Sequence, residues 1–166
     1  MELFPEYTSL TKSSLPLPLA ARMRPDSLEK YFGQEHLIGK GLPLRELVET
    51  ESGLSFILWG PPGSGKTTLA RIAAKLTESV FHEISAVNAG VADIRKVVQS
   101  ATQIWKAKGS RTILFLDEIH RFNKVQQDAI LPFVENGTIR LIGSTTENPS
   151  FEVIPALRSR CQIFRL

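Results

Sequence analysis

The sequence predicts an α/β domain in which a five-stranded parallel sheet, flanked by helices, carries a phosphate-binding loop. Apolar strand-like runs alternate with helical patterns, the order that builds parallel strands joined by crossover helices. Residues 60–67 read GPPGSGKT, a complete G-x-x-x-x-G-K-[ST] loop between an apolar run and a helix-forming stretch. Residues 113–116 read ILFL and are apolar at every position, which suits a central strand covered by helices on both faces.

The elements follow from local patterns in chain order. Short apolar runs predict strands at residues 54–59, 80–84, 112–116, 139–143 and 162–165. Apolar residues at helical spacing predict helices at residues 43–51, 66–77, 91–107 and 124–135. Right-handed crossovers place the carboxyl ends of parallel strands along one edge of the sheet, so we expect a ligand there.

Residues 1–18 are expected to form a flexible arm outside the folded core. The end of this segment, residues 13–18, reads SSLPLP, and its prolines interrupt any hydrogen-bonded ladder. The folded domain is expected to cover residues 19–166. The chain has 166 residues, of which 42% are hydrophobic, and this is enough to bury one sizeable core.

Composition narrows the possible functions. The net charge of +3 is only mildly basic, so it neither demonstrates nor excludes a nucleic-acid partner. The single cysteine, Cys161, excludes an internal disulfide or a cysteine-rich metal site and fits a reducing compartment. Neither a membrane-spanning apolar run nor a signal-peptide pattern appears in the sequence, so we expect a soluble, cytoplasmic protein.

The loop at residues 60–67 has the chemistry of the phosphate site of P-loop NTPases. Its glycines let backbone N–H groups turn inward around a β-phosphate, and the following helix adds the positive end of its dipole. Lys66 is expected to reach the β- and γ-phosphates of ATP, and the Thr67 hydroxyl to ligate Mg²⁺. The residues expected to bind the cofactor are Gly60, Pro61, Pro62, Gly63, Ser64, Gly65, Lys66, Thr67 and Thr68.

Two carboxylates, Asp117 and Glu118, follow the apolar run at residues 112–116 and should emerge at the same sheet edge. Asp117 would hold Mg²⁺ through its water shell, and Glu118 would polarise the water that attacks the γ-phosphate. A solvated acidic turn is the alternative. The phosphate loop upstream favours the catalytic interpretation, and the second acid favours hydrolysis over transfer to another substrate.

Two other residues are candidates for the reaction. Thr146 lies in the hydroxyl-rich segment after the strand at 139–143, and we expect it to lie between the carboxylates and the γ-phosphate. Capping of a turn is the alternative role for Thr146. Arg160 precedes the last strand, and it would either enter a neighbouring subunit's site as an arginine finger or remain a surface residue.

Several segments together resemble an AAA+ ATPase of the clamp-loader clade. They are Arg24-Pro25, FGQEH at 32–36, the phosphate loop, DEIHRFNK at 117–124, GSTTENPS at 143–150 and SRC at 159–161. The strings ISAVNAG, DEIHRFNKVQQDA, GSTTENPSFEV and PLAARMRP narrow the resemblance to the RarA/MgsA family of replication-associated recombination proteins. The resemblance covers about residues 18–166.

This resemblance implies roles for individual residues. Residues 60–67 would be the Walker A loop, and Asp117 and Glu118 the Walker B acids. Thr146 would be the sensor 1 residue, and Arg160 the finger that acts in trans.

The resemblance also assigns residues around the adenine ring and around the catalytic glutamate, Glu118. Tyr31 and Phe32 would line the adenine. Arg24 would lie on the same side or form a salt bridge within the fold, and Ser85 matches a position that restrains the catalytic glutamate in related enzymes. The chain ends at Leu166, before the family's helical lid with its sensor 2 arginine. We therefore expect this chain alone to bind nucleotide weakly and to hydrolyse ATP slowly or not at all.

Partners are implied as well. The family acts at stalled forks, gaps or junctions between single-stranded and duplex DNA, which implies a DNA-dependent ATPase of bacterial replication, repair and recombination. The full-length protein would be a homo-oligomer and a partner of single-stranded-DNA-binding protein. Residues 1–4, MELF, resemble a peptide that docks on the sliding clamp. The basic residues that would track DNA, or simply remain solvated, are Arg95, Lys96, Lys106, Lys108, Arg121 and Lys124.

Two rival functions stay open at this stage. A sliding-clamp-loader subunit would share nearly every motif of this chain. A non-catalytic, nucleotide-gated adaptor would keep the phosphate loop but lack the catalytic glutamate or the arginine finger. The presence of both Glu118 and Arg160 argues against this alternative.

Overall fold

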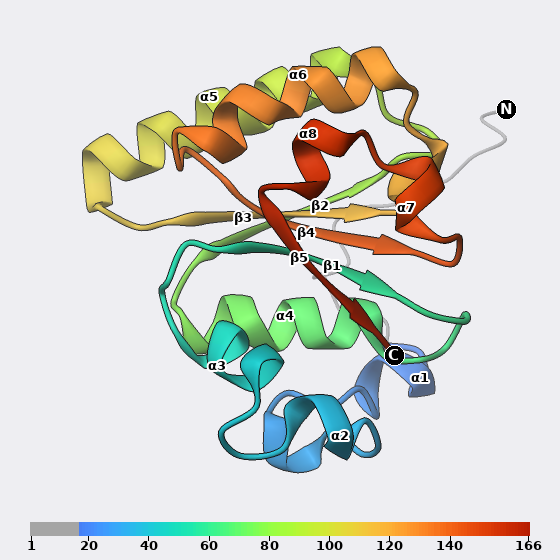
Figure 1. Cartoon of the computed structure of the whole chain (residues 1–166). Coiled ribbons are helices and arrows are strands. Elements are labelled where there is room, and N and C mark those ends of the chain that lie inside the picture. The colour runs from blue at the N-terminus through green and yellow to red at the C-terminus, as the bar shows by residue number, and fades with distance from the viewer. Residues whose placement is uncertain (1–16) are drawn as a thin grey trace, which may run out of the picture.

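A computed structural model describes residues 17–166, which form three layers (Figure 1). The middle layer is a parallel sheet with the strand order β2-β3-β4-β1-β5. Its strands are β1 (Ser55–Trp59), β2 (Val80–Ser85), β3 (Thr112–Asp117), β4 (Arg140–Thr145) and β5 (Cys161–Arg165). One face is covered by α3 (Pro43–Glu49) and α4 (Lys66–Leu76), the other by α5 (Val91–Lys108) and α6 (Lys124–Glu135).

This architecture confirms the expected five-stranded parallel sheet with flanking helices. The observed bounds of the nine expected elements differ from the expected ones by no more than two residues. Single-turn helices were not expected, because three or four residues have no room for a repeating apolar pattern. These are α1 (Leu19–Arg22), η1 (Leu28–Lys30), α2 (Glu35–Ile38), η2 (Ile119–Arg121), α7 (Pro149–Glu152) and α8 (Pro155–Arg158).

The part of the chain that the structure describes begins at residue 17, near the end of the expected arm. Residues 1–16 of the expected arm, including the clamp-docking peptide at residues 1–4, lie outside the described residues. The first described helix, α1, has no buried side chain. Within residues 17–166, no helix is both long and apolar enough to cross a membrane.

The hydrophobic core lies on both sides of the sheet. Phe56 and Phe115 belong to the cluster beneath α3 and α4, whereas Ile57 and Leu114 belong to the cluster beneath α5 and α6. Successive residues of a strand point to opposite faces, so both clusters draw on the same strands. A sheet buried on both faces therefore explains the uninterrupted apolar run at residues 113–116.

Strand β4 lies between β1 and β3, and this order positions the site. Trp59 of β1 pairs with Thr145 of β4, and Leu116 of β3 pairs with Gly143 of β4. The carboxyl ends of these three strands therefore lie side by side. The run at 113–116, expected to form a central strand, lies in β3, which is an interior strand but not the middle one. The middle strand is β4, and all its residues are buried although several are polar.

Arg140, the first residue of β4, anchors the amino edge of the sheet and is 4% exposed. Its Nε donates a hydrogen bond to the Leu54 carbonyl at 2.8 Å, and its terminal nitrogens donate to the carbonyls of Thr50 and Leu47. The guanidinium carbon lies 5.4 Å from the centroid of the Phe56 ring. Burial lowers the pKa of Arg140 to about 10. The side chain thus joins the end of α3 to the start of β1.

Replacement of Arg140 by alanine should reduce the free energy of unfolding by about 2–4 kcal/mol, because buried carbonyl groups lose their donors. Arg165→Ala is the matched control. The Arg165 guanidinium also stacks on an aromatic ring, 5.0 Å from the Trp59 centroid, but the Arg165 side chain is exposed. This substitution should therefore reduce the free energy of unfolding by less than about 1 kcal/mol. Urea unfolding followed by circular dichroism measures both values. Equal losses would contradict the anchoring role of Arg140.

Candidate nucleotide-binding site

A cavity of about 350 Å³ opens at the carboxyl edge of the sheet, where three loops meet. The loop after β1 contributes glycines and a lysine, the end of β3 contributes two acids, and the end of β4 contributes hydroxyl groups. The lining residues are Arg24, Pro62, Gly63, Gly65, Lys66, Thr67, Thr68, Asp117, Glu118, Ser144, Thr145 and Thr146. Expected site residues from three distant segments are therefore neighbours in the folded chain.

The loop after β1 depends on glycine and on a tyrosine beneath it. Gly65 has a φ of +92°, in the region that favours glycine, and a Cβ added there would collide with the Tyr31 side chain. The Tyr31 hydroxyl donates a hydrogen bond to the Ser64 carbonyl at 3.0 Å. Burial raises the pKa of Tyr31, so the phenol keeps its proton for this bond. Helix α4 then begins at Lys66 without a side-chain cap.

The Lys66 ammonium is held inside the loop. Its Nζ donates hydrogen bonds to the carbonyls of Gly60 at 2.9 Å and Pro61 at 2.8 Å, and to Ser64 Oγ at 3.3 Å. Burial lowers the pKa of Lys66, while the nearby charges of Asp117 and Glu118 act in the opposite direction. Gly60, Pro61 and Ser64, which were expected to bind nucleotide directly, thus contact the lysine and do not line the cavity.

The two acids lie at the point where β3 ends. Asp117 is the last residue of the strand, and Glu118 adopts a left-handed backbone conformation with a φ of +54°. Ser144 Oγ donates a hydrogen bond to Asp117 Oδ1 and accepts one from the Glu118 N–H at 3.3 Å. Ser85 ends the neighbouring strand β2, and its Cα pairs with that of Asp117. Ser144 was not singled out from the sequence, because a hydroxyl at a strand end is also typical of a turn residue.

The hydroxyl groups that follow in β4 are not equivalent. Thr145 Oγ1 donates to the Glu147 carbonyl at 3.0 Å and accepts from the Glu147 N–H at 2.9 Å. His120 Nδ1 lies 3.0 Å from the same hydroxyl. Thr145 is therefore engaged in the local turn, whereas Thr146, the expected sensor, lies on the cavity wall beyond it.

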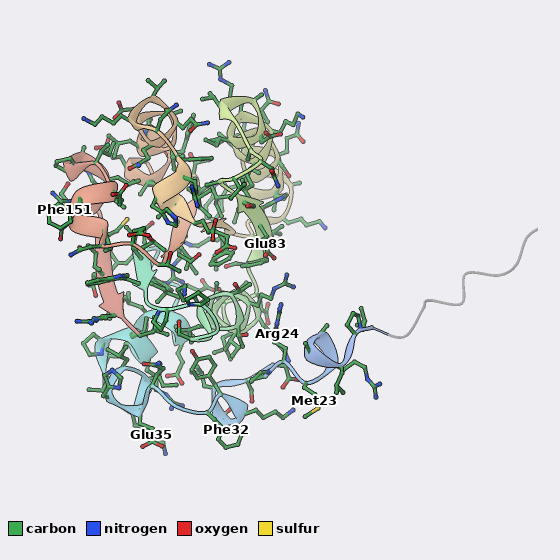
Figure 2. The ribbon with its side chains drawn as sticks, turned by 90° about the vertical axis from the view of Figure 1, so that its right-hand side faces the viewer. Met23, Arg24, Phe32, Glu35, Glu83 and Phe151 are labelled. Carbon is green, nitrogen blue, oxygen red and sulfur yellow. The ribbon has the colours of Figure 1, made fainter. Side chains whose placement is uncertain are left out.

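The two expected adenine contacts differ in position. Tyr31 is buried beneath the loop and does not line the cavity. Phe32 is 91% exposed, and Figure 2 shows its ring pointing away from the domain. The structure therefore does not bring Phe32 to the cavity, because the backbone at Tyr31 is extended and successive side chains of an extended segment point to opposite sides.

Arg24 lies on the cavity wall although it is distant in sequence from the loop. Within residues 17–166, it takes part in no ion pair. Of the two roles left open for this residue, a contact on the nucleotide side therefore fits the structure better than an internal salt bridge. The only sequence signal for it was the family resemblance.

Arg160 lies at the opposite edge of the sheet. It precedes β5, and β5 runs parallel to β1, so the start of β5 faces away from the cavity. Its guanidinium forms an ion pair with Glu135 at 2.7 Å and donates a hydrogen bond to Ser159 Oγ at 2.6 Å. Its side chain is half-exposed. Arg160 therefore does not meet the other site residues within one chain.

Tyr31→Phe should weaken the binding of a fluorescent ATP analogue about two- to tenfold, because the loop loses one hydrogen bond. Phe32→Ala should leave the affinity unchanged, since the ring is exposed and does not reach the cavity. Both affinities are measured by fluorescence anisotropy. If Phe32→Ala causes the greater loss, the adenine contact implied by the family resemblance holds and the expectation from the structure is wrong.

Known proteins are similar to this chain in sequence and in fold. The family described as ATPase family associated with various cellular activities (AAA) matches residues 56–166. Replication-associated recombination protein A of Escherichia coli K12 is 55% identical over 149 residues, which are 90% of this chain and 33% of that protein. The protein of that name from Bacillus subtilis 168 is 45% identical over 149 residues, 90% of this chain and 34% of that protein. The chain thus spans about a third of the length of these relatives.

Solved structures show the same core. The Thermotoga maritima RuvB Holliday junction branch migration motor superimposes with a TM-score of 0.69 and 31% sequence identity. The similarity covers 87% of this chain and 48% of the RuvB chain. The chain therefore belongs to the AAA ATPase family and, within it, to the RarA family of replication-associated recombination proteins.

Proposed function

We propose that this domain binds ATP with Mg²⁺ and hydrolyses it at interfaces between subunits, as the DNA-dependent motor of a protein that maintains replication forks. The observation that carries the proposal is the arrangement of Lys66, Thr67, Asp117 and Glu118 around one cavity. Membership of the AAA family supports nucleotide binding. The names of its relatives support a role in replication-associated recombination.

The residues present fit a magnesium nucleotide. The glycine conformation at Gly65 and the uncapped start of α4 leave backbone N–H groups for phosphate oxygens. Lys66 would exchange its carbonyl partners for the β- and γ-phosphates, and Thr67 with Asp117 would hold Mg²⁺. When bound, Mg²⁺ neutralises charge on the phosphate oxygens.

Hydrolysis depends on groups held in fixed positions, because positioning and charge neutralisation dominate phosphoryl transfer. Glu118 would hold the attacking water and accept its proton at the carboxylate. Thr146 would orient the same water or the γ-phosphate from the end of β4. Both residues line the cavity and belong to interior strand ends, which supports these roles.

The finger role of Arg160 requires a second subunit. Its position at the amino edge of the sheet prevents it from reaching the cavity of its own chain, whereas its half-exposed guanidinium is available to a neighbour. A homo-oligomer in which this edge approaches the next subunit's cavity would complete each site with charge from outside.

Two observations support DNA as the partner: the similarity of the fold to a DNA motor, and the basic side chains exposed on α5. A Holliday junction motor has the same core, and α5 exposes Arg95, Lys96, Lys106 and Lys108. Contacts of such side chains with phosphates would be independent of sequence and sensitive to salt. Docking on the sliding clamp and on single-stranded-DNA-binding protein remain predictions.

Glu118→Gln should retain ATP binding and lower the rate of hydrolysis at least about a hundredfold, because the amide cannot accept the proton of the water. Lys66→Ala should abolish ATP binding, which separates the loss of binding from the loss of chemistry. Binding is measured with a fluorescent ATP analogue, and hydrolysis by release of labelled phosphate with and without DNA. Unchanged hydrolysis in Glu118→Gln would reassign the base, and absence of hydrolysis in the complete protein would favour the nucleotide-gated adaptor.

Arg160→Ala should also be inactive, and mixing it with Glu118→Gln tests whether the finger acts in trans. If Arg160 enters the neighbouring site, a random equimolar mixture should recover about a quarter of the wild-type rate, since that share of interfaces combines an intact Glu118 with an intact Arg160. Hydrolysis by each variant and by the mixture is measured at equal total protein concentration. A mixture as inactive as its components would refute the trans arrangement.

A further inference from the structure

We infer that Ser144 is a positioning residue that couples the two acids of the site: its hydroxyl orients the Asp117 carboxylate for Mg²⁺ and fixes the backbone that carries Glu118. The inference rests on the proposed binding of ATP with Mg²⁺. It adds to the mechanism a residue that acts through its neighbours, the two acids.

The first observation is the double use of one buried hydroxyl. Ser144 is fully buried and lies on β4 directly beside the end of β3. A hydroxyl has one proton to donate and lone pairs to accept with. In Ser144 the proton goes to Asp117 Oδ1, and a lone pair accepts the Glu118 N–H at 3.3 Å. One oxygen atom therefore sets the position of both acids.

The second observation is the backbone of Glu118. A φ of +54° with a ψ of +49° is uncommon for a residue with a side chain and persists only where the surroundings hold it. Here the N–H is held by Ser144, and the carbonyl accepts the Arg121 N–H at 2.8 Å. Because β3 has ended, the Ser144 hydroxyl takes the place of a ladder partner for the Glu118 amide.

The third observation is that nearby polar groups are engaged elsewhere. The Thr145 hydroxyl is bonded within the turn to Glu147, and the Lys66 ammonium is bonded to the carbonyls of Gly60 and Pro61. In the part of the chain that the structure describes, Ser144 makes the only side-chain hydrogen bond to the Asp117 carboxylate. Loss of this hydroxyl would leave that carboxylate free to rotate.

Ser144→Ala tests the inference with the removal of a single oxygen. The affinity for a non-hydrolysable fluorescent ATP analogue is measured with Mg²⁺ and with EDTA. The gain in affinity on adding Mg²⁺ should fall about tenfold, while the affinity in EDTA stays unchanged. Tenfold is the lower end of the effect of residues that hydrogen-bond to a metal ligand. Hydrogen exchange measured by NMR should show the Glu118 amide exchanging up to about tenfold faster.

Two further variants separate positioning from a general loss of packing. Ser55→Ala is the matched control: Ser55 is also buried, and its Oγ accepts a hydrogen bond from the Leu141 N–H at 2.9 Å near the other end of β4. It should change neither the Mg²⁺ gain nor the Glu118 exchange rate. Ser144→Thr keeps a hydroxyl and should restore both quantities toward the wild-type values.

The outcomes distinguish this inference from the proposed function. Equal weakening of binding with Mg²⁺ and with EDTA, or an unchanged Glu118 exchange rate in Ser144→Ala, overturns the inference. If the wild-type chain gains no affinity from Mg²⁺, the proposed function fails instead, and the exchange rate alone decides whether Ser144 holds the Glu118 backbone. Unfolding midpoints of all variants are compared to confirm that each is folded.

Discussion

The pairing of β4 between β1 and β3 is the constraint on which the site depends. Parallel pairing aligns the carboxyl ends of these strands, so that three loops distant in sequence open on one cavity. Because the middle strand is buried, every polar group on it needs a partner. At the amino end of β4, Arg140 donates hydrogen bonds to carbonyl groups, and at its carboxyl end Ser144 is hydrogen-bonded to the acids. The same requirement therefore stabilises the fold and organises the chemistry.

The sheet also separates the functions of its two edges. The carboxyl edge holds the groups that would bind and cleave the nucleotide, and the amino edge holds Arg160 with its ion-pair partner Glu135. In the proposed function, Arg160 acts on a neighbouring subunit, because it lies at the edge of the sheet opposite the cavity of its own chain. Nucleotide binding and subunit assembly would thereby be coupled in the proposed function.

Much of the fold and part of the site were predictable from local sequence. The apolar run at 113–116 predicted a strand covered by helices on both faces, and the loop at 60–67 predicted a phosphate loop, because strand burial and glycine conformations leave local signatures. The position of Phe32 was not predictable, because packing decides which side of the extended segment after η1 faces the domain, and Tyr31 lies on that side. Ser144 was also overlooked, since its partners belong to another strand.

The sequence by itself determined which residues form strands and helices, and which segments carry phosphate-binding and acidic groups, because these properties depend on composition and spacing within one segment. Only the tertiary structure decided that β4 lies in the middle, that Arg24 reaches the cavity and that Arg160 does not. Strand order and side-chain direction result from packing between segments that are remote along the chain. The free energy of that packing depends on several segments together, so it cannot be inferred from the sequence of one segment.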